Sequence, residues 1–417
     1  MSALEPPPGR ASVPWTCPFC PLLCDTFGVD TGAWALTGSE CGRARAALAR
    51  FNAGTLSAQA QIDGVVCDRD AAIAAAARML AASRQPLFGG LGTDVAGARA
   101  LYPLACRTGA ICDPAGGAAL SHGSRALQDR GAFTTTLGEV HMRADLIVCI
   151  GAPPSERYPE FPRRCGAGAG GAAQVVVLKP AGTVVAEAVE PGIEVVTMDG
   201  DLFDIAATLA AQVAGRAAGD SADPLGVLAA RLHAARYAVL VFETGRLPAH
   251  GALIVEAIDR IVATLNQRTR AAALPLGGDD GASTVDAVFT WMSGLPLRTR
   301  AAPVGLEHEP VRFDAQRLLA DQAVDALLWI ASFGTEPAPP MVDLPRVVLG
   351  HPGFAAAAQG RATVFIPVST PGIGSAGHLF RTDGSVLMPL RAVRDDGLPT
   401  VADVLKRLTQ ALAEQAA

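Results

Sequence analysis

The 417-residue sequence has no apolar run long enough to cross a membrane, because its longest hydrophobic stretches are short and end in Gly, Pro or charge. Its first residues, Met-Ser-Ala-Leu-Glu-Pro-Pro-Pro, contain neither a basic region nor an apolar core, so no secretory signal is predicted. The net charge is only −6, and no block of basic residues occurs. These absences predict a cytoplasmic protein with no membrane partner and no nucleic-acid partner.

Two nucleotide-binding motifs are also missing, since no GxGxxG follows a strand and no GxxxxGKS/T loop occurs. Lysine is found only at Lys179 and Lys406, so arginine supplies nearly all of the positive charge. Aromatic residues make up 5% of the chain, whereas 50% of it is hydrophobic and both Ala and Gly are abundant. This composition predicts a large core in which helices pack closely through small residues.

Apolar segments of strand length alternate with helix-forming segments along most of the chain. Strands are expected at 145–151, 174–179 and 237–242, and a long helix is expected at 249–265. Because strands that are apolar throughout are buried on both faces, the pattern indicates parallel sheets covered by helices. We therefore predict an α/β fold with two doubly wound parallel-sheet domains.

Four of the nine cysteines lie in the first tenth of the chain, where a C-x2-C-x3-C run is followed by a fourth cysteine. They are Cys17, Cys20, Cys24 and Cys41. Four thiolates at short spacing suit one tetrahedral metal ion or one cubane iron–sulfur cluster. A second C-x2-C pair is missing, so the arrangement favours a 4Fe-4S cluster over zinc. A site without metal and two local disulfides are the alternatives, and a reducing cytoplasm argues against disulfides.

Further segments form a pattern with the cysteine run. They are Ser121–Ser124, the strand entrance at 137–147, the loop 151–154, Thr290–Pro296 and 371–384. Together they resemble the B subunit of formylmethanofuran dehydrogenase, of the molybdopterin formate-dehydrogenase-like superfamily, over nearly the whole chain.

This resemblance implies that the two α/β domains are interleaved and that a small N-terminal cysteine-cluster domain precedes them. We place the cysteine-cluster domain at 1–60. The first α/β domain is expected at 61–118 with 233–345, and the second at 119–232 with 346–417.

Three positions depart from the family pattern at the redox site. Ser121 precedes His122 where the family has a cysteine or selenocysteine that ligates tungsten or molybdenum, and Pro153 replaces an asparagine. An arginine of the family has no clear counterpart, although Arg298 and Arg300 lie near its place. We therefore expect no molybdopterin or tungstopterin, no catalytic residue, and only a vestigial pocket at Ser121 and His122.

The same degenerate pattern is similar to the B subunit of the bacterial formyltransferase/hydrolase complex, which handles a formyl group without a redox step. The resemblance implies a non-catalytic structural or carrier-binding subunit in tetrahydromethanopterin-linked one-carbon metabolism (formaldehyde oxidation). The implied partners are zinc amidohydrolase-like and formyltransferase subunits and a methanofuran-like formyl carrier. Arg157, Arg163 and Arg164 are candidates to bind that carrier through carboxylates, and a solvated arginine face is the simpler alternative.

Two other functions stay open. An active molybdenum or tungsten dehydrogenase subunit would carry both a pterin metal and a 4Fe-4S cluster. A stand-alone hydrolase would use Ser121 as its nucleophile, but adjacent residues rarely aim at each other and no orienting acid is evident. If the redox centre is lost, an electron relay has no use, which is why the metal-free cysteine site is retained as an alternative.

Overall fold

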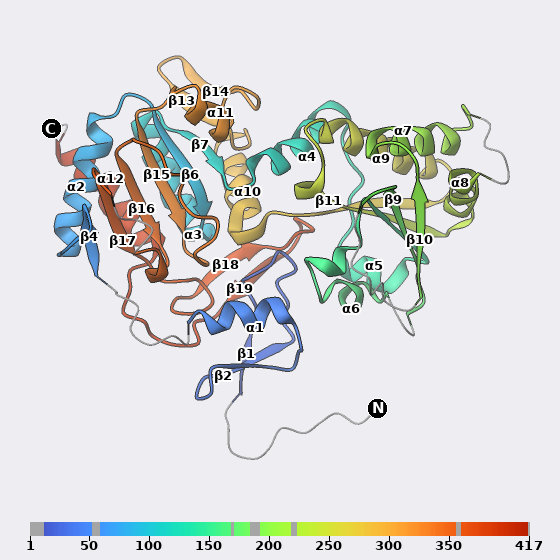
Figure 1. Ribbon diagram of the computed structural model, residues 1–417, viewed down its shortest axis with the longest axis horizontal. Helices are drawn as coiled ribbons and strands as arrows, with labels where there is room; N and C mark the ends of the chain where they lie inside the picture. The colour runs from blue at the N-terminus through green and yellow to red at the C-terminus, as the bar shows by residue number, and fades with distance from the viewer. Residues whose placement is uncertain are drawn as a thin grey trace. The chain divides into compact units, whose positions relative to one another are not determined.

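The computed structural model describes residues 12–51, 59–167, 171–183, 192–217, 223–355 and 360–415. The chain divides into two compact units, and each unit combines segments that are distant in sequence (Figure 1). Unit 1 comprises Met1–Gly117, Asp279–Phe380 and Leu387–Ala417, and unit 2 comprises Ala118–Gly278 and Arg381–Val386. Among the residues described, no helix combines the length and the apolar character that crossing a membrane requires.

Unit 1 is built on a nine-stranded sheet with the order β14-β13-β7-β6-β15-β16-β17-β4-β5. The five central strands run parallel, and antiparallel hairpins flank them on both sides. The central strands are buried throughout, as their uninterrupted apolar sequences require. The strands are β4 (Ala60–Ile62), β5 (Val65–Cys67), β6 (Pro86–Gly92), β7 (Ile111–Pro114), β13 (Thr299–Ala302), β14 (Gly305–His308), β15 (Ala326–Ala331), β16 (Arg346–Gly350) and β17 (Thr363–Pro367).

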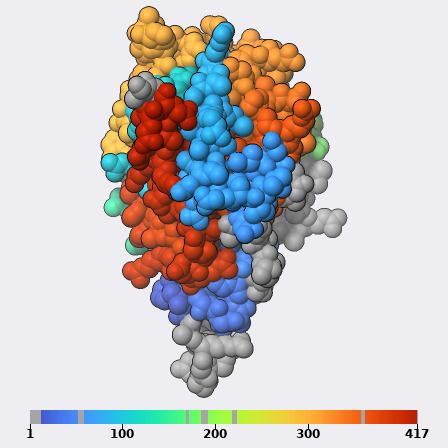
Figure 2. Space-filling view, turned by 90° about the vertical axis from the view of Figure 1, so that its left-hand side faces the viewer, coloured from blue at the N-terminus to red at the C-terminus, as the bar shows by residue number. Residues whose placement is uncertain are grey.

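Alternation along these strands divides the side chains between two cores, one on each face of the sheet. Leu328 and Val347 lie in the core formed with α2, α3, α10 and α12. Leu327 and Val348 lie in the second core, together with Phe354 and residues of α11. On the surface, α12 lies beside α2, where Figure 2 shows red atoms next to light-blue atoms. The helices are α2 (Arg69–Ala82), α3 (Val95–Thr108), η3 (Asp279–Gly281), α10 (Ala282–Ser293), α11 (Ala315–Ala320), η4 (Pro352–Phe354) and α12 (Val401–Gln415).

The cysteine segment belongs to unit 1 and has a three-stranded antiparallel sheet of its own. The indole Nε1–H of Trp15 donates to the carbonyl of Gly372 at 2.8 Å, so this segment is fixed to the C-terminal part of unit 1. A second small sheet, the hairpin β18–β19, also belongs to unit 1. The elements are β1 (Ser12–Trp15), β2 (Phe27–Asp30), β3 (Ala35–Thr37), α1 (Gly42–Ala49), β18 (Gly377–Phe380) and β19 (Leu387–Leu390).

Unit 2 is built on a five-stranded parallel sheet with the order β10-β9-β8-β11-β12. Helices α7, α8 and α9 share a core with alternate residues of β8, β9 and β11. The elements are α4 (Gly117–Arg130), α5 (Leu137–Arg143), β8 (Leu146–Ile150), η1 (Pro154–Glu156), α6 (Phe161–Cys165), β9 (Gln174–Pro180), β10 (Ile193–Met198), α7 (Leu202–Val213), α8 (Pro224–Ala234), β11 (Tyr237–Glu243), η2 (Thr244–Arg246), α9 (Gly251–Leu265) and β12 (Arg270–Leu276).

The mixed α/β class with parallel sheets agrees with the prediction, but the two units divide the chain differently from the expected domains. Because β11 and β12 pair with β8, residues 233–278 join unit 2. Because β16 and β17 pair with β15, residues 346–380 join unit 1. Strands that are apolar throughout all look alike in sequence, so their pattern identifies them without showing which neighbours they pair with.

Candidate functional site

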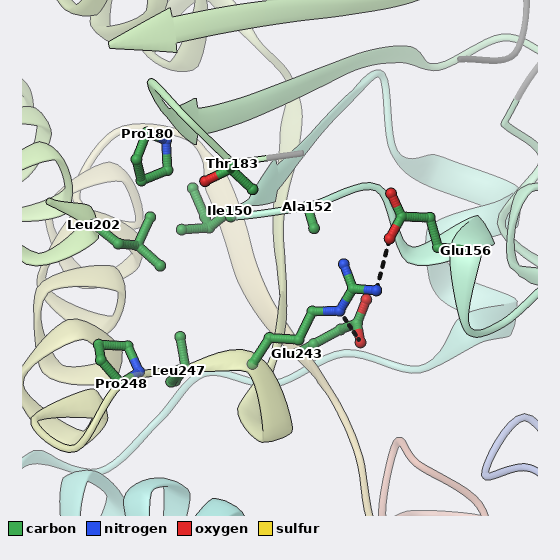
Figure 3. Close-up of a pocket in the computed structure, with 11 residues that line it drawn as sticks. Ile150, Ala152, Glu156, Pro180, Thr183, Leu202, Glu243, Leu247 and Pro248 are labelled. Carbon is green, nitrogen blue, oxygen red and sulfur yellow. Dashed lines mark hydrogen bonds and ion pairs between the residues drawn. The ribbon is translucent and has the colours of Figure 1, made fainter. Parts of the chain in front are cut away.

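A cavity of about 490 Å³ lies at the carboxyl edge of the unit 2 sheet (Figure 3). The chain passes from β8 to β9 on one side and later returns to β11 on the other, so the loops that follow β8 and β11 diverge. Open parallel sheets bind their ligands at such points. The lining residues are Ile150, Gly151, Ala152, Glu156, Pro180, Thr183, Leu202, Glu243, Arg246, Leu247 and Pro248.

An ion network runs along one wall of this cavity. Glu243 ends the buried strand β11, and its side chain is 3% exposed. The 3₁₀ turn η2 brings Arg246 back beside it, with Nε 3.5 Å from Glu243 Oε2 and Nη2 2.6 Å from Glu156 Oε2 (Figure 3). Arg157 Nη1 lies 3.4 Å from the same Glu243 oxygen. Two carboxylates therefore face two guanidinium groups, and apolar residues such as Leu202 line the rest of the cavity.

The loop after β8 has few donors for a phosphate group. Gly151, at φ +97°, uses its N–H to donate to the carbonyl of Leu178 at 2.8 Å. Pro153 and Pro154 have no N–H, and the 3₁₀ turn that follows is only three residues long. Phosphates in such folds are held by a glycine-rich turn and a helix N-terminus. The loop therefore offers few backbone N–H groups to a phosphate.

Ser121 and His122 lie in the middle of α4 and are not brought together as a pair. Successive helical residues point about 100° apart around the axis, so the two side chains diverge. The ring of His122 packs on the first residue of α9, where a Cβ on Gly251 would lie 2.7 Å from His122 Cδ2. Helix packing therefore sets the position of Ser121 and His122. The two side chains do not form a nucleophile–base pair.

The three candidate carrier-binding arginines differ in position. Arg157 contacts Glu243 and stacks over the ring of Tyr158, with Cζ 5.7 Å from its centroid. Arg163 pairs with Glu160, one residue before the short helix α6. Arg164 lies in the same helix, and neither it nor Arg163 lines the cavity. Carrier binding by these arginines remains a prediction.

The two arginines that lie near the place of the family arginine have structural roles. Arg298 is 6% exposed and donates from Nε to Asp113 Oδ1 at 2.9 Å and from Nη2 to Asp314 Oδ2 at 2.6 Å. Arg300 pairs with Glu307 across the hairpin β13–β14, at 2.8 Å. Arg298 therefore joins segments of unit 1 that are distant in sequence, and Arg300 stabilises the hairpin β13–β14.

All four N-terminal cysteines are buried, with exposed fractions of 4% for Cys17, 7% for Cys20, 2% for Cys24 and 6% for Cys41. A tight turn folds the run on itself, since the N–H of Cys17 donates to the carbonyl of Cys24 at 2.9 Å. No group of three or more His, Cys, Asp or Glu in the described ranges is arranged to hold a metal ion. The four predicted donors are thus buried and close in sequence, but their side chains in the described structure are not arranged around a metal position.

Burial raises the pKa of Cys17, and the other three thiols of the cluster raise it further. Burial likewise raises the pKa of Cys20 to about 11, although the guanidinium of Arg43 opposes this shift. The backbone N–H groups of Phe19 and Leu22 donate to these two sulfurs and favour the thiolate forms. Metal binding to these thiols would therefore release protons.

Glu243 and Arg246 are site residues that the motifs did not identify. Their signal was present, because a charged residue ends an otherwise apolar strand and a glycine follows two positions later. Ligand-binding residues of parallel sheets often occupy this place. Only the strand pairing shows that the ends of β8 and β11 are neighbours.

No family model matches the chain. It is 32% identical over 370 residues to the B subunit of the formyltransferase/hydrolase complex Fhc of Methylorubrum extorquens, covering 85% of this chain and 98% of that protein. It is 25% identical over 431 residues to the B subunit of the tungsten-containing formylmethanofuran dehydrogenase 2 of Methanocaldococcus jannaschii, covering 95% and 98%. A crystal structure of the formyltransferase/hydrolase complex FhcABCD from Methylorubrum extorquens with methylofuran matches with a TM-score of 0.75 and 30% identity, covering 86% of this chain and 99% of that one.

Proposed function

Because the chain belongs to the family of formyltransferase/hydrolase complex B subunits, we propose that it is a non-redox, non-catalytic member of such a complex. Its partners would be the amidohydrolase-like and formyltransferase subunits, and its ligand a methanofuran-like formyl carrier. The assembly would act in one-carbon metabolism in the cytoplasm. The similar crystal structure contains four kinds of subunit and methylofuran, which supports this assignment.

The observation that carries the non-redox role is the oxygen at Ser121, where the resembling dehydrogenases have a sulfur or selenium ligand to the metal. The structure adds physical support at two positions. Ser121 is a residue of the regular helix α4, and Pro153 and Pro154 remove backbone donors from the loop after β8. A serine hydroxyl is a harder ligand than the thiolates such metals are given, and the loop has fewer N–H groups for a phosphate; both points support the proposal.

We further propose that Cys17, Cys20, Cys24 and Cys41 hold a 4Fe-4S cluster as a structural group. Four buried thiols, two of which accept backbone N–H donors, are a donor set of the right chemistry for thiolate ligation. When bound, the cluster would cross-link the turn at 17–24 to the start of α1 and contribute to folding.

The test is to purify the assembly through this chain, identify its companion subunits, and measure its metals and activities. We expect formyl transfer to be unchanged in Ser121→Ala, no formate-coupled dye reduction, and far less than one tungsten or molybdenum per chain. Stoichiometric tungsten together with dye reduction would instead establish the redox function.

The cluster has a separate test, because its loss does not bear on the catalytic question. Anaerobically purified protein should contain iron and show broad visible absorption, and Cys17→Ser should abolish both. Cys67→Ser is the matched control, since Cys67 lies apart from the cluster in β5. Iron-free wild-type protein after anaerobic reconstitution would refute the cluster.

An active tungsten dehydrogenase subunit is the second candidate, because the tungsten-containing relative aligns with 95% of this chain. A stand-alone hydrolase is less well supported, because Ser121 and His122 diverge on α4. If the isolated chain hydrolysed formyl esters and Ser121→Ala abolished this, the hydrolase would replace the proposed role.

A further inference from the structure

Three basic side chains gather at the carboxyl edge of the unit 1 sheet, around the ring of Phe51. Arg50 follows α1 and reaches the loop after β15, since a Cβ on Gly334 would lie 2.5 Å from Arg50 Nη1. His351 follows β16, and its ring centroid lies 4.8 Å from that of Phe51. Arg394 donates from Nη1 to the carbonyl of Phe51 at 3.0 Å, and its Cζ lies 5.8 Å from the ring.

Neither of these guanidinium groups forms an ion pair within the part of the chain that the structure describes. Acids close to Arg394 in sequence are engaged elsewhere, because Asp395 accepts from the N–H of Gly397 and Asp396 accepts from the hydroxyl of Ser369. The undescribed stretches 52–58 and 356–359, which lie close in sequence to Arg50 and His351, contain no Asp or Glu. Among the residues that the structure describes, the positive charge here is therefore not neutralised by ion pairs as it is around Glu243.

Asp280 is the acid that most nearly competes for Arg50. It contributes an electrostatic interaction with Arg50 but lies beyond ion-pair distance from it. Burial, followed by the neighbouring Asp279, raises the pKa of Asp280 to about 6. Asp279 itself is held by Arg43, with Nη2 2.6 Å from Oδ1. Arg50 therefore keeps its donors available in the described structure.

His351 adds a buried donor to the two arginines. His351 is only 2% exposed, and its Nδ1 accepts from the N–H of Gly353 at 3.0 Å. The second nitrogen, Nε2, therefore carries the hydrogen of the neutral ring, and it has no hydrogen-bond partner among the described residues. Burial, with Arg394 and Arg50, lowers the pKa of His351 to about 4, so the ring is neutral at pH 7.

We propose that Arg50, Arg394 and His351 form a binding site for a small oxyanion, either a carboxylate or a phosphate. Two guanidinium groups and one imidazole N–H supply only donors, which is what an oxyanion accepts. The place agrees, because β15 and β16 are parallel strands and ligands of such sheets bind at their carboxyl ends. This site does not depend on the proposed function, and its chemistry is distinct from the balanced ion network of the unit 2 cavity.

The experiment measures binding of glutarate, and separately of inorganic phosphate, to the full-length chain at pH 7 and low ionic strength. Calorimetry gives the affinity, and the fluorescence of Trp34 gives a local signal, because Arg394 Cζ lies 5.1 Å from its ring. The variants are Arg50→Gln and Arg394→Gln. Arg391→Gln is the matched control, because it removes the same charge from an exposed position three residues away.

We expect saturable binding of at least one anion and a loss of roughly tenfold or more in affinity for either variant, since hydrogen bonds to charged groups are the strong ones. Arg391→Gln should bind within about twofold of the wild type. Tighter binding of glutarate would assign a carboxylate ligand, and tighter binding of phosphate would assign a phosphate ligand. Absence of saturable binding of both anions, or an equal loss in Arg391→Gln, would overturn the proposal. Unchanged melting temperatures of the variants would show that folding is intact.

Discussion

The parallel strands of the two sheets end in edges that differ in how their charged side chains are paired. In unit 2 the buried Glu243 faces Arg157 and Arg246, so acids and bases balance. In unit 1 Arg50 and Arg394 lie beside a neutral histidine, with no ion-pair partner in the described ranges. The two edges have the same parallel-strand geometry, yet one is neutralised internally and the other retains charge for a ligand. The difference indicates that strand order places the two edges alike, while side-chain pairing gives them different charge.

Replacing both Arg157 and Arg246 by Gln should have the largest effect. It removes both cations that face the buried carboxylate of Glu243, and breaking buried pairs in this way costs about 3–5 kcal/mol. Denaturant unfolding should show this loss, and adding Glu243→Gln should restore most of the stability. The control Arg163→Gln breaks a more exposed pair with Glu160 and should cost less than about 1 kcal/mol. Equal losses of stability in the double variant and in Arg163→Gln would contradict the expected difference between the buried network and the exposed pair.

A smaller effect is expected at Asp259, an acid of unit 2 that lacks such cations. It is 6% exposed, and its Oδ2 has no hydrogen-bond partner in the described structure. Burial, and then Glu256, raises its pKa from 3.8 to about 6. The folded state therefore binds more protons than the unfolded state between about pH 4 and pH 6, and stability falls as pH rises through that window.

Asp259→Asn should accordingly be more stable than the wild type by about 1–2 kcal/mol at pH 7, with the difference vanishing near pH 4. Urea unfolding at both pH values measures this. Asp199→Asn, at an exposed position, should change stability by less than about 0.5 kcal/mol at either pH. A destabilised Asn variant at pH 7 would show that the carboxylate has a partner.

The smallest effect is expected at Arg50. Its guanidinium has no ion-pair partner to lose in the described structure, so Arg50→Gln should change the free energy of unfolding by less than about 0.5 kcal/mol. Thermal unfolding, with and without added phosphate, checks this expectation. A loss near that of the unit 2 double variant would mean that the two edges are alike after all.

Much of the strand and helix order could be predicted from the sequence, because the buried strands are uninterrupted apolar runs. The strands at Gln174–Pro180 and Tyr237–Glu243 and the helix at Gly251–Leu265 lie where the pattern places them. The segment 137–147 was expected to lead into a strand, and it does so through the short helix α5, which precedes β8. The signal for α5 was the N-cap Thr136, whose Oγ1 accepts from the N–H of Glu139 at 3.1 Å.

The candidate site was less predictable. The four cysteines could be identified because their spacing is local in sequence. The network around Glu243 could not, because Arg157 lies 86 residues away along the chain and meets it only through the pairing of β8 with β11. The cluster around Phe51 joins residues separated by 343 positions, Phe51 and Arg394, and no local pattern encodes such a contact.

The discontinuous make-up of unit 1 has a consequence for biosynthesis. Residues 118–278 form nearly all of unit 2 as one uninterrupted stretch, so this unit can fold soon after it leaves the ribosome. In unit 1, β6 must wait for its neighbour β15, about 240 residues later, and helices α2 and α3 must wait for α12, which follows later still. We therefore expect the apolar edge of β6 and the uncovered faces of α2 and α3 to depend on chaperones while the chain is still growing.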